Sequence, residues 1–166
     1  MNILGIVGWK NSGKTGLVVR LVEALTARGY SVSTLKHAHH SFELDQSGKD
    51  SFRHREAGAK EVLVASSRRW ALMHESKSPR TPAASELVVK LEPVDIILVE
   101  GFKRFDCPKI ETRRHASRGG PLAGRLPNVV AIASDGRVVD STLPVFDLDA
   151  TSEIADFIER HFGLSA

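Results

Sequence analysis

The sequence contains a single cysteine, Cys107, among its 166 residues. One thiol excludes a disulfide within the chain, and disulfide-free proteins are typical of a reducing cytosol, so we expect a cytoplasmic protein. Cys107 could act as a nucleophile, but that role needs a partner base, and the sequence offers none that we can assign. A buried or incidental thiol is therefore the interpretation we favour.

Long apolar runs and targeting segments are also missing. No stretch approaches the ~18 consecutive apolar residues of a membrane-spanning helix, and the first apolar run ends at Gly8 without the charged start of a signal peptide. We expect no membrane association. The net charge of +3 is spread along the chain and does not indicate a nucleic-acid partner.

What is present is the pattern of a phosphate-binding loop. Residues Gly8–Thr15 fit G-x-x-x-x-G-K-[ST], between an apolar run over 2–7 and a helix with one apolar face over 17–28. In this pattern backbone N–H groups surround a phosphate, Lys14 reaches the β- and γ-phosphates, and the Thr15 hydroxyl binds Mg²⁺. An accidental glycine turn is the alternative, and the strand–loop–helix setting argues against it. The nucleotide-binding residues predicted here are Gly8, Lys10, Asn11, Ser12, Gly13, Lys14, Thr15 and Gly16.

Strands alternate with helices over most of the chain. Their apolar runs lack polar alternation, as expected when both faces of a sheet are covered. We predict one α/β domain over residues 1–166, a P-loop NTPase domain with a mainly parallel sheet flanked by helices. Further helices are predicted over 50–57, 84–91 and 151–161, the last capped by Thr151. Strands are predicted over 2–7, 30–37, 61–66, 68–75, 94–101, 108–113, 129–133, 138–139 and 145–148, with 68–75 antiparallel to 61–66. Residues 116–127 are predicted as a loop, for which disorder is an alternative.

Ligands of such folds bind at the carboxyl ends of strands, so chemistry is sought there. The strongest apolar strand ends in Glu100, where a Walker B carboxylate would hold Mg²⁺ through water or orient the attacking water. A surface glutamate that merely ends the strand is the alternative. We predict Glu100 as a catalytic and metal-side residue, with Lys14 as the catalytic cation.

A histidine-rich segment, Lys36–His40, follows the second strand. It could be a switch-like segment that contacts Mg²⁺ or the γ-phosphate through Asp45 or Asp50, or it could bind a transition metal through His37, His39 and His40. A solvated polar loop is the remaining alternative. We predict Asp45 as a metal ligand beside Thr15 and Glu100.

Asp135 follows the strand over 129–133. A carboxylate there could accept both N1–H and N2–H of guanine, which adenine does not offer. Standard GTPases use Asn-Lys-x-Asp at this place, whereas Ile132 and Ala133 replace the first two residues here. We predict guanine recognition by Asp135, with a simple Asp-Gly turn as the alternative.

Taken in order, these segments resemble the MobB family of molybdopterin-guanine dinucleotide biosynthesis adaptor proteins. The likeness extends from Ile3 to about Arg160. It rests on the segments Gly8–Thr15, Leu35–His40, Gly48–Ser51, Ala65–Met73 and Leu98–Lys103. The resemblance implies a homodimer that binds GTP with Mg²⁺, hydrolyses it weakly, and assists the guanylyltransferase that joins GMP to molybdopterin. It also implies the nucleotide roles of Lys14, Thr15 and the segment Val99–Lys103, and preference for GTP over ATP rests on it.

Two other functions share the same loop. A metal-delivery GTPase would load a metal through Lys36–His40, and a small-molecule kinase would transfer the γ-phosphate to a substrate. The sequence assigns no Gln or Arg to position the attacking water or act as an arginine finger, which is consistent with slow hydrolysis.

Overall fold

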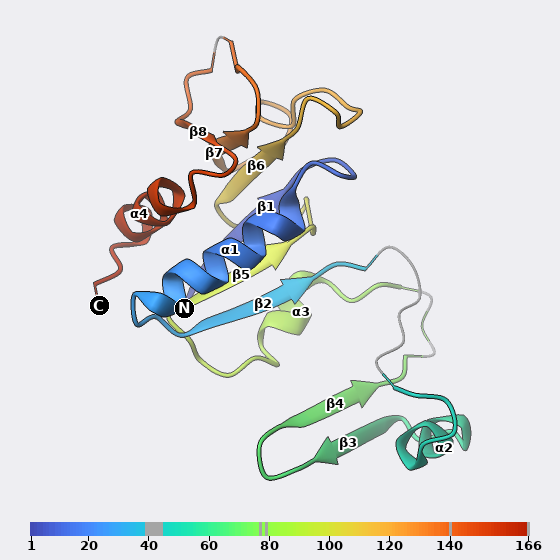
Figure 1. Ribbon diagram of the computed structural model, residues 1–166. Coiled ribbons are helices and arrows are strands. Elements are labelled where there is room, and N and C mark those ends of the chain that lie inside the picture. The colour runs from blue at the N-terminus through green and yellow to red at the C-terminus, as the bar shows by residue number, and fades with distance from the viewer. Residues whose placement is uncertain (39–44, 77, 79, 140, 166) are drawn as a thin grey trace. The chain divides into compact units, whose positions relative to one another are not determined.

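A computed structural model describes residues 1–38, 45–76, 78, 80–139 and 141–165. The chain forms two compact units, one made of Met1–His37 with Ala83–Ala166 and the other of Ala38–Pro82 (Figure 1). No helix in the described part of the chain is both long enough and apolar enough to span a bilayer.

The larger unit is built on a six-stranded sheet with the order β2-β5-β1-β6-β7-β8. All of its strand pairs are parallel, which confirms the predicted α/β class. The strands are β1 (Asn2–Val7), β2 (Val32–Lys36), β5 (Ile96–Glu100), β6 (Lys109–Arg113), β7 (Val129–Ser134) and β8 (Val145–Asp147). Because β1 lies between β5 and β6, the loop that follows β1 lies at the carboxyl edge of the sheet, near its middle.

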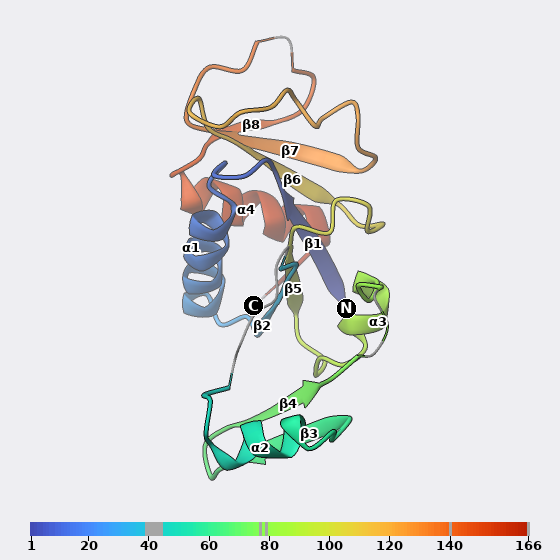
Figure 2. The same ribbon diagram turned by 90° about the vertical axis from the view of Figure 1, so that its right-hand side faces the viewer.

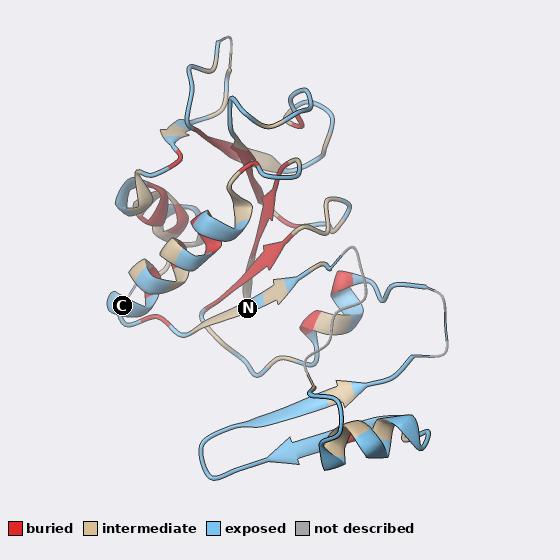
Figure 3. Ribbon diagram, turned by 45° about the vertical axis from the view of Figure 1, so that its right-hand side comes forward, coloured by how far each residue is buried: buried red, intermediate tan, exposed pale blue. Residues whose placement is uncertain are grey.

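Helices cover both faces of this sheet. α1 (Lys14–Ala27) and α4 (Thr151–Phe162) pack together on one face, and α3 (Ala84–Val88) lies on the other (Figure 2). Successive side chains of β5 pack on opposite faces of the sheet. Ile96 and Leu98 pack in the core with α1 and α4, whereas Ile97 and Val99 pack with Val88 of α3. β5 is therefore buried along its whole length (Figure 3), which explains its continuous apolar sequence.

The smaller unit consists of α2 (Asp50–Glu56) and a hairpin of β3 (Glu61–Ala65) and β4 (Trp70–His74). The two strands are antiparallel, as predicted. Val62 is buried, and α2 packs against its strand. The opposite face, which carries Leu63, Trp70 and Leu72, is exposed (Figure 3).

Some predicted details are wrong. Val138 and Val139 form no strand: they lie in the connection between β7 and β8, which pair directly with each other. Thr151 does not cap α4: the cap position is Ala150, and the Thr151 hydroxyl instead accepts a hydrogen bond from Arg20 Nε at 3.0 Å. α3 ends at Val88, three residues before the predicted end at Leu91.

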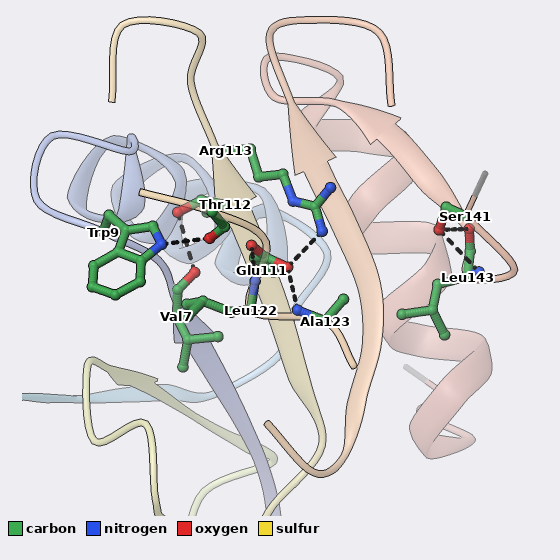
Figure 4. A network of polar contacts seen from close by, with 10 residues as sticks. Val7, Trp9, Glu111, Thr112, Arg113, Leu122, Ala123, Ser141 and Leu143 are labelled. Atoms are coloured by element: carbon green, nitrogen blue, oxygen red, sulfur yellow. Dashed lines mark hydrogen bonds and ion pairs between the residues drawn. The ribbon is translucent and has the colours of Figure 1, made fainter. Parts of the chain in front are cut away.

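The glycine- and proline-rich loop over 116–127 is held in place by a buried carboxylate. Glu111 on β6 is 1% exposed and accepts hydrogen bonds from the backbone N–H groups of Leu122 (2.8 Å) and Ala123 (2.7 Å) (Figure 4). Arg113 Nη2 pairs with the same carboxylate at 2.8 Å. The alternative of disorder for this loop is therefore wrong.

Candidate functional site

The loop over Gly8–Thr15 connects β1 to α1 in a tightly packed turn. Gly8 lies against Ser12 Oγ and Thr112 Oγ1 so closely that a Cβ atom would collide with both. Gly13, which precedes α1, has φ +94°, a conformation that favours glycine. Asn11 also has positive φ (63°), which asparagine tolerates better than most residues. The sequence pattern thus corresponds to real backbone requirements.

Thr112 on β6 fastens the loop to the neighbouring strand. Its hydroxyl shares a 2.8 Å hydrogen bond with the buried Ser12 hydroxyl. It also donates to the Val7 carbonyl at 3.3 Å (Figure 4). Lys14 folds back over the same loop, where Nζ donates to the Trp9 carbonyl at 2.7 Å and the Gly8 carbonyl at 3.3 Å. Burial lowers the pKa of Lys14 below its usual range, although the Glu100 carboxylate acts in the opposite direction. In this structure the Lys14 ammonium donates its hydrogen bonds to two backbone carbonyls of the loop. A phosphate chain bound in the loop would take the place of these carbonyls as its acceptor.

Glu100 and Thr15 meet at the carboxyl end of β5. The Thr15 hydroxyl donates to Glu100 Oε1 at 2.6 Å, and the Glu100 residue is 8% exposed. Lys36, at the end of β2, lies 3.5 Å from Glu100 Oε2 and 3.4 Å from Thr15 Oγ1. A hydroxyl and a carboxylate are the hard oxygen ligands that Mg²⁺ prefers, and the Lys36 ammonium is the cation that pairs with this carboxylate here. The donor set therefore fits Mg²⁺.

Asp135 follows β7 and is held by the backbone of the neighbouring β6 loop. Its Oδ1 accepts the His115 N–H at 2.8 Å, and its own N–H donates to the Arg113 carbonyl at 3.3 Å. Ser134 Oγ accepts the Gly136 N–H at 3.2 Å, so a turn begins here. These contacts are compatible with both interpretations of Asp135, and its guanine role stays a prediction.

Asp45 and the histidine segment lie in other surroundings. Asp45 belongs to the smaller unit, where Oδ1 accepts from the Ser51 hydroxyl at 2.9 Å and Oδ2 lies 3.7 Å from an Arg55 nitrogen. Its role as a metal ligand stays a prediction. His37 packs edge-on against Phe102, with 4.8 Å between ring centroids. His39 and His40 lie outside the described residues, and no group of three metal-ligating side chains occurs among the residues that are described.

A loop after β6 packs against Trp9, a contact that no local sequence pattern predicts. The Trp9 indole N–H, labelled in Figure 4, donates to the Gly120 carbonyl at 2.7 Å. Gly119 packs against the same ring. Lys103 Nζ lies 4.0 Å from the centroid of the same ring, a cation–π contact. A cavity of about 420 Å³ opens here at the ends of β6 and β7, lined among others by Trp9 and Arg114. Sequence reasoning missed these contacts because Trp9 and the 114–128 loop are about a hundred residues apart.

A parallel sheet whose central strand leads through a glycine-bordered, lysine-containing loop into a helix defines the P-loop NTPase class of fold. The family model described as "Molybdopterin guanine dinucleotide synthesis protein B" matches residues 3–135, and the chain belongs to this family, MobB.

Relatives and solved structures agree with this assignment. The molybdopterin-guanine dinucleotide biosynthesis adapter protein of Haemophilus influenzae is 39% identical over 95% of this chain and 88% of its own length. The protein of the same name from Escherichia coli is 35% identical over 94% of this chain and 90% of its own. The crystal structure of Bacillus subtilis MobB has a TM-score of 0.70 at 28% identity, covering 94% of this chain and 97% of that one.

Proposed function

We propose that this protein is a GTP-binding adaptor with weak GTPase activity that assists the attachment of GMP to molybdopterin. The observation that carries the proposal is the meeting of Lys14, Thr15 and Glu100 at the carboxyl ends of β1 and β5, in a chain of the MobB family. The names of the relatives supply the pathway.

In this proposal the chain's own residues bind and orient the nucleotide. Lys14 exchanges its hydrogen bonds to the Gly8 and Trp9 carbonyls for contacts with the β- and γ-phosphates. The backbone N–H groups at the start of α1 donate to the same phosphates. Thr15 and Glu100 would hold Mg²⁺, directly or through water, and the bound ion would neutralise phosphate charge. Glu100 also orients a water toward the γ-phosphate.

Guanine recognition is assigned to Asp135. The His115 N–H fixes one oxygen of that carboxylate, which positions the side chain for the paired donors of guanine. The cavity at the ends of β6 and β7 gives space beside this residue, since Ser134 and Gly136 line it.

The partners in this proposal are a molybdopterin guanylyltransferase and a second copy of the chain. An exposed apolar surface on the β3–β4 hairpin, which we call the hairpin face, supports self-association. It comprises Leu63 (61% exposed), Trp70 (61%) and Leu72 (49%), with Ala65 opposite Trp70. A cytoplasmic location is consistent with the free, buried thiol of Cys107.

The nucleotide assignment is tested by Lys14→Ala. Removing an ammonium that binds phosphate should weaken GTP affinity about 100-fold, since charged hydrogen bonds of this kind contribute about 1.5–3 kcal/mol each. Isothermal titration with GTP and Mg²⁺ measures this loss. The matched control is Lys90→Ala, which removes an exposed lysine elsewhere in the larger unit and should leave affinity unchanged. Equal affinity of wild type and Lys14→Ala would remove Gly8–Thr15 as the nucleotide site.

A further inference from the structure

Arg114 lies against the phosphate-binding loop, although it is a hundred residues away in the sequence. It follows β6, and its Nε lies only 3.1 Å from where a Cβ atom on Gly13 would be, with Cζ at 3.6 Å. Leu148, which follows β8, is 2.8 Å from the same point. The guanidinium is thus packed beside the last glycine before α1, where the first N–H groups of the helix are unpaired within it.

The described residues leave the charge of this guanidinium without a neutralising partner. Among the described residues Arg114 makes no side-chain hydrogen bond or ion pair, and the side chain is exposed. Its neighbours differ: Arg113 pairs with Glu111 at 2.8 Å, and Arg20 pairs with Asp149 at 3.0 Å. An unpaired surface arginine is ordinary by itself. An unpaired arginine that lies against a phosphate-binding loop, however, offers a planar, permanently charged hydrogen-bond donor to an anion in that loop.

The sheet order says which part of a nucleotide Arg114 can reach. β5 and β6 flank β1 on opposite sides. Glu100, at the end of β5, marks the side of the metal and the terminal phosphate, and Arg114, after β6, marks the other side. A phosphate chain lying across the loop with its terminal group toward Glu100 therefore directs its nucleoside end toward Arg114. Arg114 also lines the cavity of about 420 Å³ at the ends of β6 and β7, which leaves room for a nucleoside.

We propose that Arg114 is a nucleotide-binding residue whose guanidinium contacts the α-phosphate of a nucleoside triphosphate held in the Gly8–Thr15 loop. This inference rests on the proposed GTP site and adds to it a contact on the nucleoside side. Arg114 complements Lys14, which serves the β- and γ-phosphates at the centre of the loop.

The test compares the wild type with Arg114→Gln, which keeps part of the side-chain stem and removes the charge. Three probes are titrated with Mg²⁺: GTP, methyl triphosphate, which has an α-phosphate but no nucleoside, and pyrophosphate, which fills only the Lys14 and Thr15 side of the loop. We expect Arg114→Gln to weaken GTP and methyl triphosphate about tenfold, a typical effect of one charge-assisted contact, and pyrophosphate less than twofold.

The control is Arg118→Ala, which removes another exposed arginine of the same loop and should leave all three affinities unchanged. Unaltered GTP affinity in Arg114→Gln overturns the proposal, as does an equal loss for pyrophosphate, which would indicate only a general electrostatic effect. A loss confined to GTP also overturns it, because the contact would then be with the nucleoside. A wild type that binds none of the probes contradicts the GTP site itself, so the two failures are distinct.

Discussion

At the scale of single residues, the larger unit depends on a carboxylate that is almost completely buried. Burial alone would raise the pKa of Glu111, but the hydrogen bond from Arg113 and those from the N–H groups of Leu122 and Ala123 outweigh it and hold the pKa below its usual range. Glu111 therefore stays charged, and through Leu122 and Ala123 it fixes the loop that packs against Trp9. This single side chain links β6 to the surroundings of the phosphate site.

Glu111→Gln tests this role. The amide nitrogen would face an N–H donor, and Arg113 would lose its partner, so we expect the free energy of unfolding to fall by about 3 kcal/mol at neutral pH. Because the folded-state pKa is depressed, the contribution of Glu111 is complete above the ordinary value of 4.5 and is lost as the pH falls through the folded-state pKa. Urea unfolding at several pH values should show the gap between variant and wild type narrowing in acid. Glu92→Gln, at an exposed position, is the control, and a gap independent of pH would contradict the account.

At the scale of elements, local patterns were predictable and long-range contacts were not. The loop over Gly8–Thr15, the hairpin of β3 and β4 and the buried strand ending at Glu100 depend on contiguous residues, so their sequences predicted them. Thr112 and Arg114 reach the loop only because β6 lies beside β1, a pairing between segments about a hundred residues apart. The strand over 108–113 was predicted, but nothing in its sequence specifies its neighbour.

The hairpin is the element that we expect to bring two copies together. Leu63 and Leu72 are cross-strand partners on the hairpin face and are 61% and 49% exposed. Replacing both with serine should shift sedimentation equilibrium from dimer to monomer, because the apolar area that drives association is removed. Since both side chains are exposed, circular dichroism should remain that of the wild type. Val89→Ser, at a residue that is 74% exposed in the larger unit, should leave association intact. A monomeric wild type, or a double variant that dimerises normally, would contradict this assignment.

At the scale of the whole molecule, the proposed nucleotide site and the hairpin belong to separate compact units. The larger unit carries the contacts that we assign to GTP: the Gly8–Thr15 loop, Glu100, Asp135 and Arg114. Asp45, which is predicted as a metal ligand, belongs to the smaller unit. The smaller unit carries the hairpin face. This division suits an adaptor, in which nucleotide binding and protein contacts are served by different surfaces.

The central claim is that the nucleotide site of this protein assists attachment of GMP to molybdopterin. The most direct measurement follows formation of molybdopterin guanine dinucleotide by a purified guanylyltransferase with GTP, Mg²⁺ and either the wild-type protein or Lys14→Ala. Our account predicts that the wild-type protein increases the yield and that Lys14→Ala, although folded, does not. Equal stimulation by both proteins, or none by the wild type, would contradict it.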